Sequence, residues 1–513
     1  EPAAVADLLA LAVLNSHGGE LTLLPMRKRW CLFAVPLLIC PSAHAEDLSA
    51  ESLSSLSSVG SSTFEVIGNA SSLSSIPELS SHALGGAAGD AAGELDAKKR
   101  VPGTNGKRIR YTSVNERGEK VPVTGALYDR PFAKGLVVLA PGTRGLGDQC
   151  APSAASSMLS SLGRDGTVNI NYEAPMVQML LDDGYRVVVT DYMGLGTDGL
   201  HTYLNRVDQG RAVIDAARAV AKRGEKVAFW GYSQGGGAAA AAAELVGDYA
   251  PELNVVGTFA GAPPADPLGV LQQASAPMLT AVAGFAAASF SDTYPEFHEA
   301  IQEYLTDDGK ALLEDLKTSC VVDASRNAPK IAGDMFVDGK TFADIAEEDE
   351  RIGKYLEHNK LGKVKPNAPI MVLTNPDDDL VPEPQATQLA EDYCALDAEV
   401  EYRRVVVPGS PTQPLSSGRR ELTPRAPGSG HALPLVLQTG NVSDWLSDRF
   451  KGKPMKQVCP SDHPEYEVVE GLNAVEITAI VVAVLGTLGL WAYTGSGPLP
   501  SLPSLPSLPS LPF

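Results

Sequence analysis

The feature that most constrains this chain is a serine set between an apolar run and a block of small residues, AFWGYSQGGGAAAAAA at 228–243. An apolar run followed by glycine and alanine predicts a strand that turns sharply into a helix, since a tight turn needs residues without side-chain bulk. Ser233 lies at the apex, two residues after Gly231 and two before Gly235. This G-x-S-x-G spacing predicts a nucleophile elbow, which presents its serine outward.

Short apolar runs alternate with helix-like stretches along the middle of the chain. The runs are 135–142, 185–192, 226–233, 254–261, 369–376 and 402–409. They lack a polar alternation, which is typical of strands buried on both faces of a parallel sheet. Helix-like stretches such as 208–224 lie between them. We therefore expect an α/β fold with a mostly parallel sheet flanked by helices, preceded by a two-stranded hairpin over 106–129.

The strand pattern divides the folded sequence into three segments. We expect the two parts of the α/β core at 100–264 and 366–460. Between them, residues 265–365 hold Ala-rich apolar sequence and then acidic helix-like sequence, which predicts an inserted, mainly helical cap or lid domain. Residues 46–99 are rich in Ser, Gly and Ala and predict a flexible spacer.

The N-terminal region has the layout of a secretory signal. Residues 26–45 contain a basic segment, an apolar segment and the cleavage pattern Ala43-His44-Ala45. Residues 1–25 precede this signal and are interpreted as an upstream extension. The formal net charge of −21 fits an exported protein and argues against nucleic acid as a partner, because phosphates need a basic surface.

The C-terminal region is apolar and then repetitive. Residues 477–493 carry no charge, so we expect a transmembrane anchor within 475–494, with a surface helix or a removed tail as alternatives. Residues 495–513 form a Pro/Leu/Ser low-complexity tail.

The cysteine count indicates disulfides. Removal of the signal also removes Cys31 and Cys40. Four cysteines then remain, namely Cys150, Cys320, Cys394 and Cys459. An even number in an exported chain predicts two disulfides, and four cysteines allow three pairings.

A serine nucleophile needs an acid and a histidine, which follow it in that order in α/β-hydrolases. Asp377, Asp378 and Asp379 come directly after the strand at 369–376. The D-x-x-V-P spacing selects Asp378, while either neighbour, or a solvated loop without a catalytic role, is the alternative. His431 fits the base, in a loop ahead of the helix containing VSDWLSDRF.

Acyl transfer also needs hydrogen-bond donors for the negatively charged oxygen of the tetrahedral intermediate. One candidate is the backbone N–H of Gln234, directly after the serine. The second is expected in the glycine-rich loop at 139–153, with Thr143 and Arg144 as candidates. The same loop lacks the Lys-Ser/Thr pair of a phosphate-binding P-loop.

Four motifs together resemble the secretory lipase family of the lipase A type. They are APGTRGLGDQCAPS, NYEAPMVQMLLDDGYRVVVTDYMGLG, HTYLNR and GYSQGG, within a similarity that covers roughly 100–460. The resemblance implies an α/β-hydrolase core with a cap over the site, and Ser233, Asp378 and His431 as nucleophile, acid and base. It also implies the disulfides Cys150–Cys320 and Cys394–Cys459. The apolar segment 477–493 and the long loop before His431 depart from the family pattern.

We therefore expect an exported or surface-anchored serine ester hydrolase, acting on lipid or ester at a lipid–water interface without metal or organic cofactor. A triacylglycerol lipase is the leading interpretation. The alternatives are an acyltransferase to a cell-envelope alcohol and an inactive binding protein on the same fold. The sequence leaves the oligomeric state open.

The cap sequence PMLTAVAGFAAASF at 277–290 is expected to face the acyl chain. Its small residues would leave room for the chain. The larger ones, Met278, Leu279, Phe285 and Phe290, would line a substrate groove. The alternative is that this stretch is the core helix of the cap.

Overall fold

The computed structural model describes residues 91–94, 106–154, 160–162, 168–272, 277–327, 335–407 and 428–468. All of them belong to the unit formed by residues 65–513. The predicted signal peptide, the extension before it, most of the spacer, the apolar segment 477–493 and the C-terminal tail lie outside the described residues. Among the residues that are described, no helix is long and apolar enough to span a bilayer.

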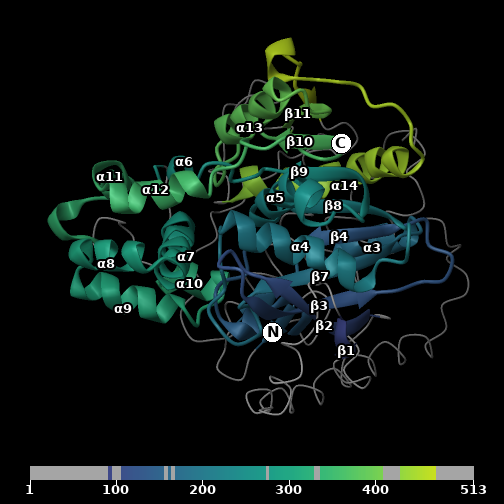
Figure 1. Cartoon of the computed structure of the whole chain (residues 1–513). Coiled ribbons are helices and arrows are strands. Elements are labelled where there is room, and N and C mark those ends of the chain that lie inside the picture. The colour runs from purple at the N-terminus through teal and green to yellow at the C-terminus, as the bar shows by residue number, and fades with distance from the viewer. Residues whose placement is uncertain are drawn as a thin grey trace, which may run out of the picture. The chain divides into compact units, whose positions relative to one another are not determined.

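A ten-stranded mixed sheet runs through the molecule, in the order β1-β2-β3-β7-β4-β8-β9-β10-β11-β12 (Figure 1). The strands are β1 (Ala91–Glu94), β2 (Gly106–Val114), β3 (Lys120–Tyr128), β4 (Leu136–Ala140), β7 (Arg186–Met193), β8 (Lys226–Tyr232), β9 (Asn254–Gly261), β10 (Ile370–Thr374), β11 (Val400–Val406) and β12 (Glu467–Val468). Strands β1, β2, β3 and β7 pair antiparallel in that order, and every pair from β7 to β12 is parallel. The short strands β5 (Ser160–Leu162) and β6 (Val168–Ile170) pair separately.

The predicted hairpin and the six predicted strands are all present, so the expected α/β class is confirmed. Residues 91–94, which lie within the predicted spacer, form β1 and pair with β2. Pairing with the edge strand β2 gives strand structure to a segment whose composition alone predicts flexibility.

Helices cover both faces of the sheet and position the elements of the site. The helices of the described residues are α3 (Ala174–Asp182), α4 (Arg206–Val220), α5 (Gln234–Tyr249), α6 (Pro267–Leu271), α7 (Pro277–Thr293), α8 (Pro295–Tyr304), α9 (Asp307–Leu316), α10 (Val321–Asn327), α11 (Phe342–Glu348), α12 (Glu350–His358), α13 (Glu383–Ala395) and α14 (Ser429–Phe450). Val138 and Phe229 pack with α4 and α5 on one face, while Val137 and Trp230 pack with α3 and α14 on the other. This two-sided burial explains why β4 and β8 are apolar almost throughout.

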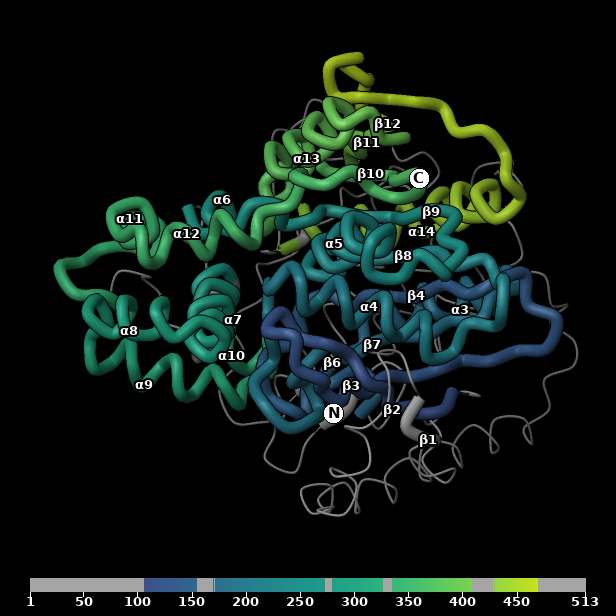
Figure 2. Tube along the Cα trace, in the orientation of Figure 1, coloured from purple at the N-terminus to yellow at the C-terminus, as the bar shows by residue number. Residues whose placement is uncertain are grey.

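Helices α6 to α12 lie between β9 and β10 and are grouped beside the sheet (Figures 1 and 2). They share one apolar cluster, which includes Phe285, Phe290 and Phe297. Tyr294 of this group accepts a hydrogen bond from Asn205 of the core at 3.0 Å and lies 2.7 Å from a Glu116 carboxylate oxygen. Buried polar contacts therefore attach the helical insertion to the core.

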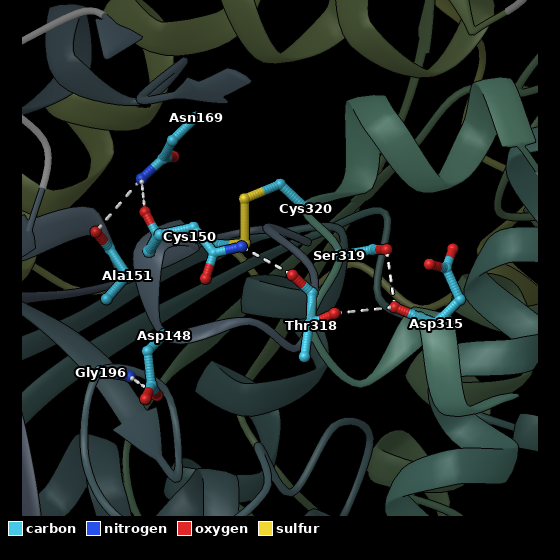
Figure 3. Close-up of a disulfide and its surroundings, with 10 residues drawn as sticks. Asp148, Cys150, Ala151, Asn169, Gly196, Asp315, Thr318, Ser319 and Cys320 are labelled. Atoms are coloured by element: carbon cyan, nitrogen blue, oxygen red, sulfur yellow. Dashed lines mark hydrogen bonds between the residues drawn. A yellow bond between two sulfur atoms is a disulfide. The ribbon is translucent and has the colours of Figure 1, made fainter. Parts of the chain in front are cut away.

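Two disulfides are present, Cys150–Cys320 and Cys394–Cys459, and both have the expected pairing. Figure 3 shows the first of them, which joins the loop after β4 to the segment between α9 and α10. Backbone hydrogen bonds run beside it, from Val321 to Arg144 at 2.7 Å and from Leu146 to Ser319 at 3.0 Å. The loop after β4 is thereby tied to the helical insertion both covalently and by its backbone.

Strand β8 turns into α5 at Ser233, where the chain has φ 59° and ψ −129°. The first turn of α5 then passes very close to the end of β4. A Cβ atom on Gly235 would lie 2.0 Å from the carbonyl oxygen of Ala140, a distance that real Cβ atoms do not show. Glycine at this position is therefore required by the approach of the helix to the strand.

We expect Gly235→Ala to lower the melting temperature, because the added methyl group must push α5 away from β4 at a typical overpacking cost of about 1–3 kcal/mol. Gly237→Ala is the matched control, since its Cβ would meet Pro264 at an ordinary 3.4 Å and alanine favours a helix by about 1 kcal/mol over glycine. Thermal unfolding followed by circular dichroism measures both. Equal melting temperatures for the two variants would contradict the close approach.

Candidate functional site

The loop after β10 holds one buried carboxylate against a histidine. Asp378 has a fully buried side chain, and its Oδ2 lies 2.7 Å from Nδ1 of His431. Its Oδ1 accepts the backbone N–H groups of Leu380 at 2.9 Å and Val381 at 2.8 Å. Because a carboxylate only accepts, the proton of neutral His431 lies on Nδ1 and its Nε2 is left as a base.

Two further polar residues of this loop bind the backbone around His431. Asp379 accepts hydrogen bonds from the N–H of Gly428 at 2.6 Å and of His431 at 3.1 Å. The amide of Asn375 donates to the carbonyl oxygen of Gly430 at 2.7 Å. The acid loop thus holds both the ring of the histidine and the chain that carries it.

His431 lies in the first turn of α14, which corrects the prediction of a loop ahead of the helix. The sequence misleads here because Pro434 resembles a helix break. Proline has no N–H, so the carbonyl of Gly430, four residues earlier, loses its helical partner, and Asn375 supplies that hydrogen bond instead. Asp379 accepts the N–H of His431, as a capping residue does for the first turn of a helix.

The turn that carries Ser233 lies against the same histidine. The ring of Tyr232 is 5.2 Å from the imidazole of His431, and its hydroxyl donates to the carbonyl oxygen of His431 at 2.7 Å. Tyr232 and Gln234 are both buried at 2% exposure, whereas Ser233 between them is half-buried. The Asp378–His431 pair therefore lies beside the turn that carries Ser233, and Ser233 is more exposed than its two neighbours in that turn.

The electrostatic environment favours a charged imidazole. Burial acts to lower the pKa of His431, but the charge and hydrogen bond of Asp378, together with the charge of Asp379, outweigh it and raise the pKa above its ordinary value. A proton that arrives at Nε2 is stabilised by both carboxylates.

The loop after β4 is held by a buried ion pair. Arg144 and Glu173 form this pair, and the guanidinium lies 3.9 Å above the ring of Tyr172. Glu173 also accepts the N–H of Gly142 at 2.7 Å. The side chain of Arg144 is 3% exposed, so it is engaged in the interior.

Thr143 and Gln234, the other two predicted donors of this region, contact the segment that follows β7. The hydroxyl of Thr143 is 2.8 Å from that of Tyr203, and the side-chain amide nitrogen of Gln234 is 3.0 Å from Nε2 of His201. Sequence reasoning missed Glu173, His201 and Tyr203 as site residues. The signal in the sequence is that Glu173 lies in the motif NYEAP, and His201 and Tyr203 lie in the motif HTYLNR.

The predicted groove residues of α7 differ in their surroundings. Phe285 is fully buried, and its ring lies 5.9 Å from that of Tyr203. Phe290 is also fully buried, but it packs against Tyr294 and Phe297 inside the helical insertion. Leu279 is 6% exposed. The side chain of Met278 lies outside the described part of the chain.

Known proteins share this architecture. The closed-state crystal structure of Candida antarctica lipase A superimposes with a TM-score of 0.59 at 19% identity, covering 78% of this chain and 90% of that one. At that identity the likeness shows the fold, which is the α/β-hydrolase fold.

Sequence relatives include a Mycobacterium tuberculosis protein named as a probable inactive lipase, 30% identical over 55% of this chain and 59% of its own length. A secreted triacylglycerol lipase of Malassezia globosa is 26% identical over 61% of this chain and 62% of its own length. The matches thus span about 60% of these curated relatives. The model of the secretory lipase family matches residues 159–458, more than half of the sequence, and the chain belongs to that family.

Proposed function

We propose that this protein is an exported serine carboxylic ester hydrolase that acts on triacylglycerols through an acyl-enzyme. The observation that carries the proposal is the 2.7 Å hydrogen bond between Asp378 and His431, beside the sharp turn that presents Ser233. A buried acid, a histidine and a serine on a strained turn serve nucleophilic catalysis in many hydrolases.

In the proposed reaction, Ser233 Oγ forms a bond to the ester carbonyl carbon while His431 Nε2 takes the hydroxyl proton. Asp378 stabilises the resulting imidazolium. The tetrahedral intermediate collapses by breaking the bond to the alcohol oxygen, which receives the proton from His431. Water then attacks the acyl-enzyme by the same route, releasing the carboxylic acid and restoring Ser233.

The backbone N–H of Gln234 and the loop at Thr143 are the proposed donors to the oxyanion. Gln234 is the first residue of α5, so its N–H has no acceptor within the helix and lies at the positive end of the helix dipole. Arg144 is assigned the different part of holding this loop through its buried ion pair with Glu173.

Export is supported by the two disulfides and by relatives named as secreted lipases. Attachment to a membrane through residues 477–493 stays a prediction, and so does the signal at 26–45. Acyl transfer to another alcohol would use the same residues. Because one relative is named as a probable inactive lipase, the experiments below also test whether this protein hydrolyses esters at all.

Ser233→Ala should reduce kcat on nitrophenyl esters by roughly 10⁴-fold or more, since nucleophile and base act as a unit. Ser325→Ala is the control, because that hydroxyl bonds to the Val321 carbonyl inside α10. Steady-state kinetics with circular dichroism separate loss of chemistry from loss of fold. A Ser233→Ala variant that keeps a substantial part of the turnover would show that the nucleophile lies elsewhere.

Asp378→Asn should lower kcat by about 10³–10⁴-fold and also change the pH profile. The base must be neutral to act, so kcat/KM rises as the pH passes the pKa of His431. The charge of Asp378 raises this pKa, and without it burial dominates, so the rise should move to lower pH. Asp379→Asn should give a smaller loss and a smaller shift in the same direction. A larger loss in Asp379→Asn or Asp377→Asn would identify a different acid.

The acyl chain is proposed to lie along α7, where Phe285 approaches the core at Tyr203. Phe285→Trp should then shift the preference among nitrophenyl esters toward shorter acyl chains. Phe290→Trp is the comparison, because its neighbours Tyr294 and Phe297 belong to the helical insertion, and it should lower the melting temperature without changing the profile. The same response from both variants would mean that this helix only packs the cap.

A further inference from the structure

One short segment between β7 and α4 contacts both sides of the proposed oxyanion hole. His201 and Tyr203 are 1% and 2% exposed. The imidazole of His201 meets the side chain of Gln234 at 3.0 Å, and the hydroxyl of Tyr203 meets that of Thr143 at 2.8 Å. Gln234 follows the nucleophile directly, and Thr143 lies in the loop after β4. The two proposed donor segments are therefore bridged through residues 201–203.

The hydrogen bonds of His201 define its protonation. Its Nδ1 is 3.0 Å from the carbonyl oxygen of Met193, which can only accept, so Nδ1 carries the proton. Its Nε2 then accepts from the amide of Gln234. Burial lowers the pKa of His201 to about 4, in agreement with a neutral ring. The ring also stacks on Tyr192 at 5.6 Å, so its orientation is fixed from three directions.

Tyr203 joins this histidine to the loop and to the helical insertion. Its backbone N–H donates to the carbonyl of His201 at 2.8 Å, and its ring lies 6.0 Å from the imidazole. The centroid of the Tyr203 ring also lies 5.9 Å from that of Phe285 in α7. The loop residue Thr143 also accepts a hydrogen bond at its carbonyl from Tyr172 at 3.1 Å, so its backbone and its hydroxyl are held separately.

We propose that His201 and Tyr203 are positioning residues that set the separation of the two oxyanion donors. The proposal rests on the proposed function. Oxyanion donors act only when they lie about 2.7–3.1 Å from the developing charge, and a lost donor costs roughly 10²–10³ in kcat. A displaced donor should therefore cost less than this and should affect kcat more than KM.

Tyr203→Phe removes only the hydroxyl, and we expect a roughly 5- to 20-fold fall in kcat with little change in KM. Thr143→Val removes the same hydrogen bond from the other side. The kcat of the double variant should therefore be no lower than that of the more impaired single variant. Tyr111→Phe is the matched control, because its buried hydroxyl bonds to Thr190 and to the Ala212 carbonyl. It should lower the melting temperature and leave kcat unchanged.

His201 is tested by the pair His201→Gln and His201→Leu. Glutamine can keep an acceptor where Nε2 lies, whereas leucine leaves the buried amide of Gln234 without its partner. We expect His201→Gln to keep more of the wild-type kcat than His201→Leu does. Should His201→Leu fail to fold, the comparison of Tyr203→Phe with Thr143→Val decides the question.

Three outcomes would overturn the inference. If the wild type hydrolyses esters, Ser233→Ala is inactive and Tyr203→Phe keeps the wild-type kcat, the positioning role is wrong while the proposed function stands. Losses that multiply in the double variant of Tyr203 and Thr143 would show that the two residues act independently. A wild type without any ester turnover would remove the proposed function and this inference with it.

Discussion

The contact between the loop after β10 and the first turn of α14 is the constraint on which the site depends. Asn375, Asp378 and Asp379 each bind a different group of residues 428–431. The approach is so close that a Cβ atom on Gly430 would lie 2.0 Å from the carbonyl oxygen of Asp377. One loop therefore orients the imidazole and also fixes the backbone from which it extends.

The same contact also provides the hydrogen bond that α14 lacks at Pro434. A proline inside a helix leaves a carbonyl without its N–H partner, which is costly when the carbonyl is buried. Here the amide of Asn375 takes the place of the missing N–H. The local defect of the helix becomes the point at which the acid loop is attached, and the histidine lies one residue from that point.

The sequence predicts the elements of this fold better than it predicts their polar connections. The predictions of Ser233, Asp378 and His431 rest on the spacing of the elbow, the place of an acid after a late strand and chain order, which are local patterns. The ion pair of Arg144 with Glu173 joins residues 29 positions apart, and the contact of His201 with Gln234 spans 33. Such partners are determined by the order in which the strands pair in the sheet, and local sequence patterns do not encode that order.

Two differences from the predictions have similar physical causes. Helix α14 begins ahead of the predicted helix at VSDWLSDRF, and its first turn contains His431; the hydrogen bond that a helix with Pro434 lacks comes from Asn375, which is distant in sequence. The composition of β1 gives no strand signal, and its strand structure comes with its pairing to β2. In both cases a tertiary hydrogen bond outweighs the local preference.

The most direct test of the central claim is covalent labelling of the folded, disulfide-bonded protein with a fluorophosphonate, followed by intact-mass and peptide mass spectrometry. A serine activated by His431 and Asp378 should take up one phosphonyl group per chain, on the peptide that contains Ser233, and Asp378→Asn should slow the labelling. An unmodified protein, or a label on any other residue, would contradict the account.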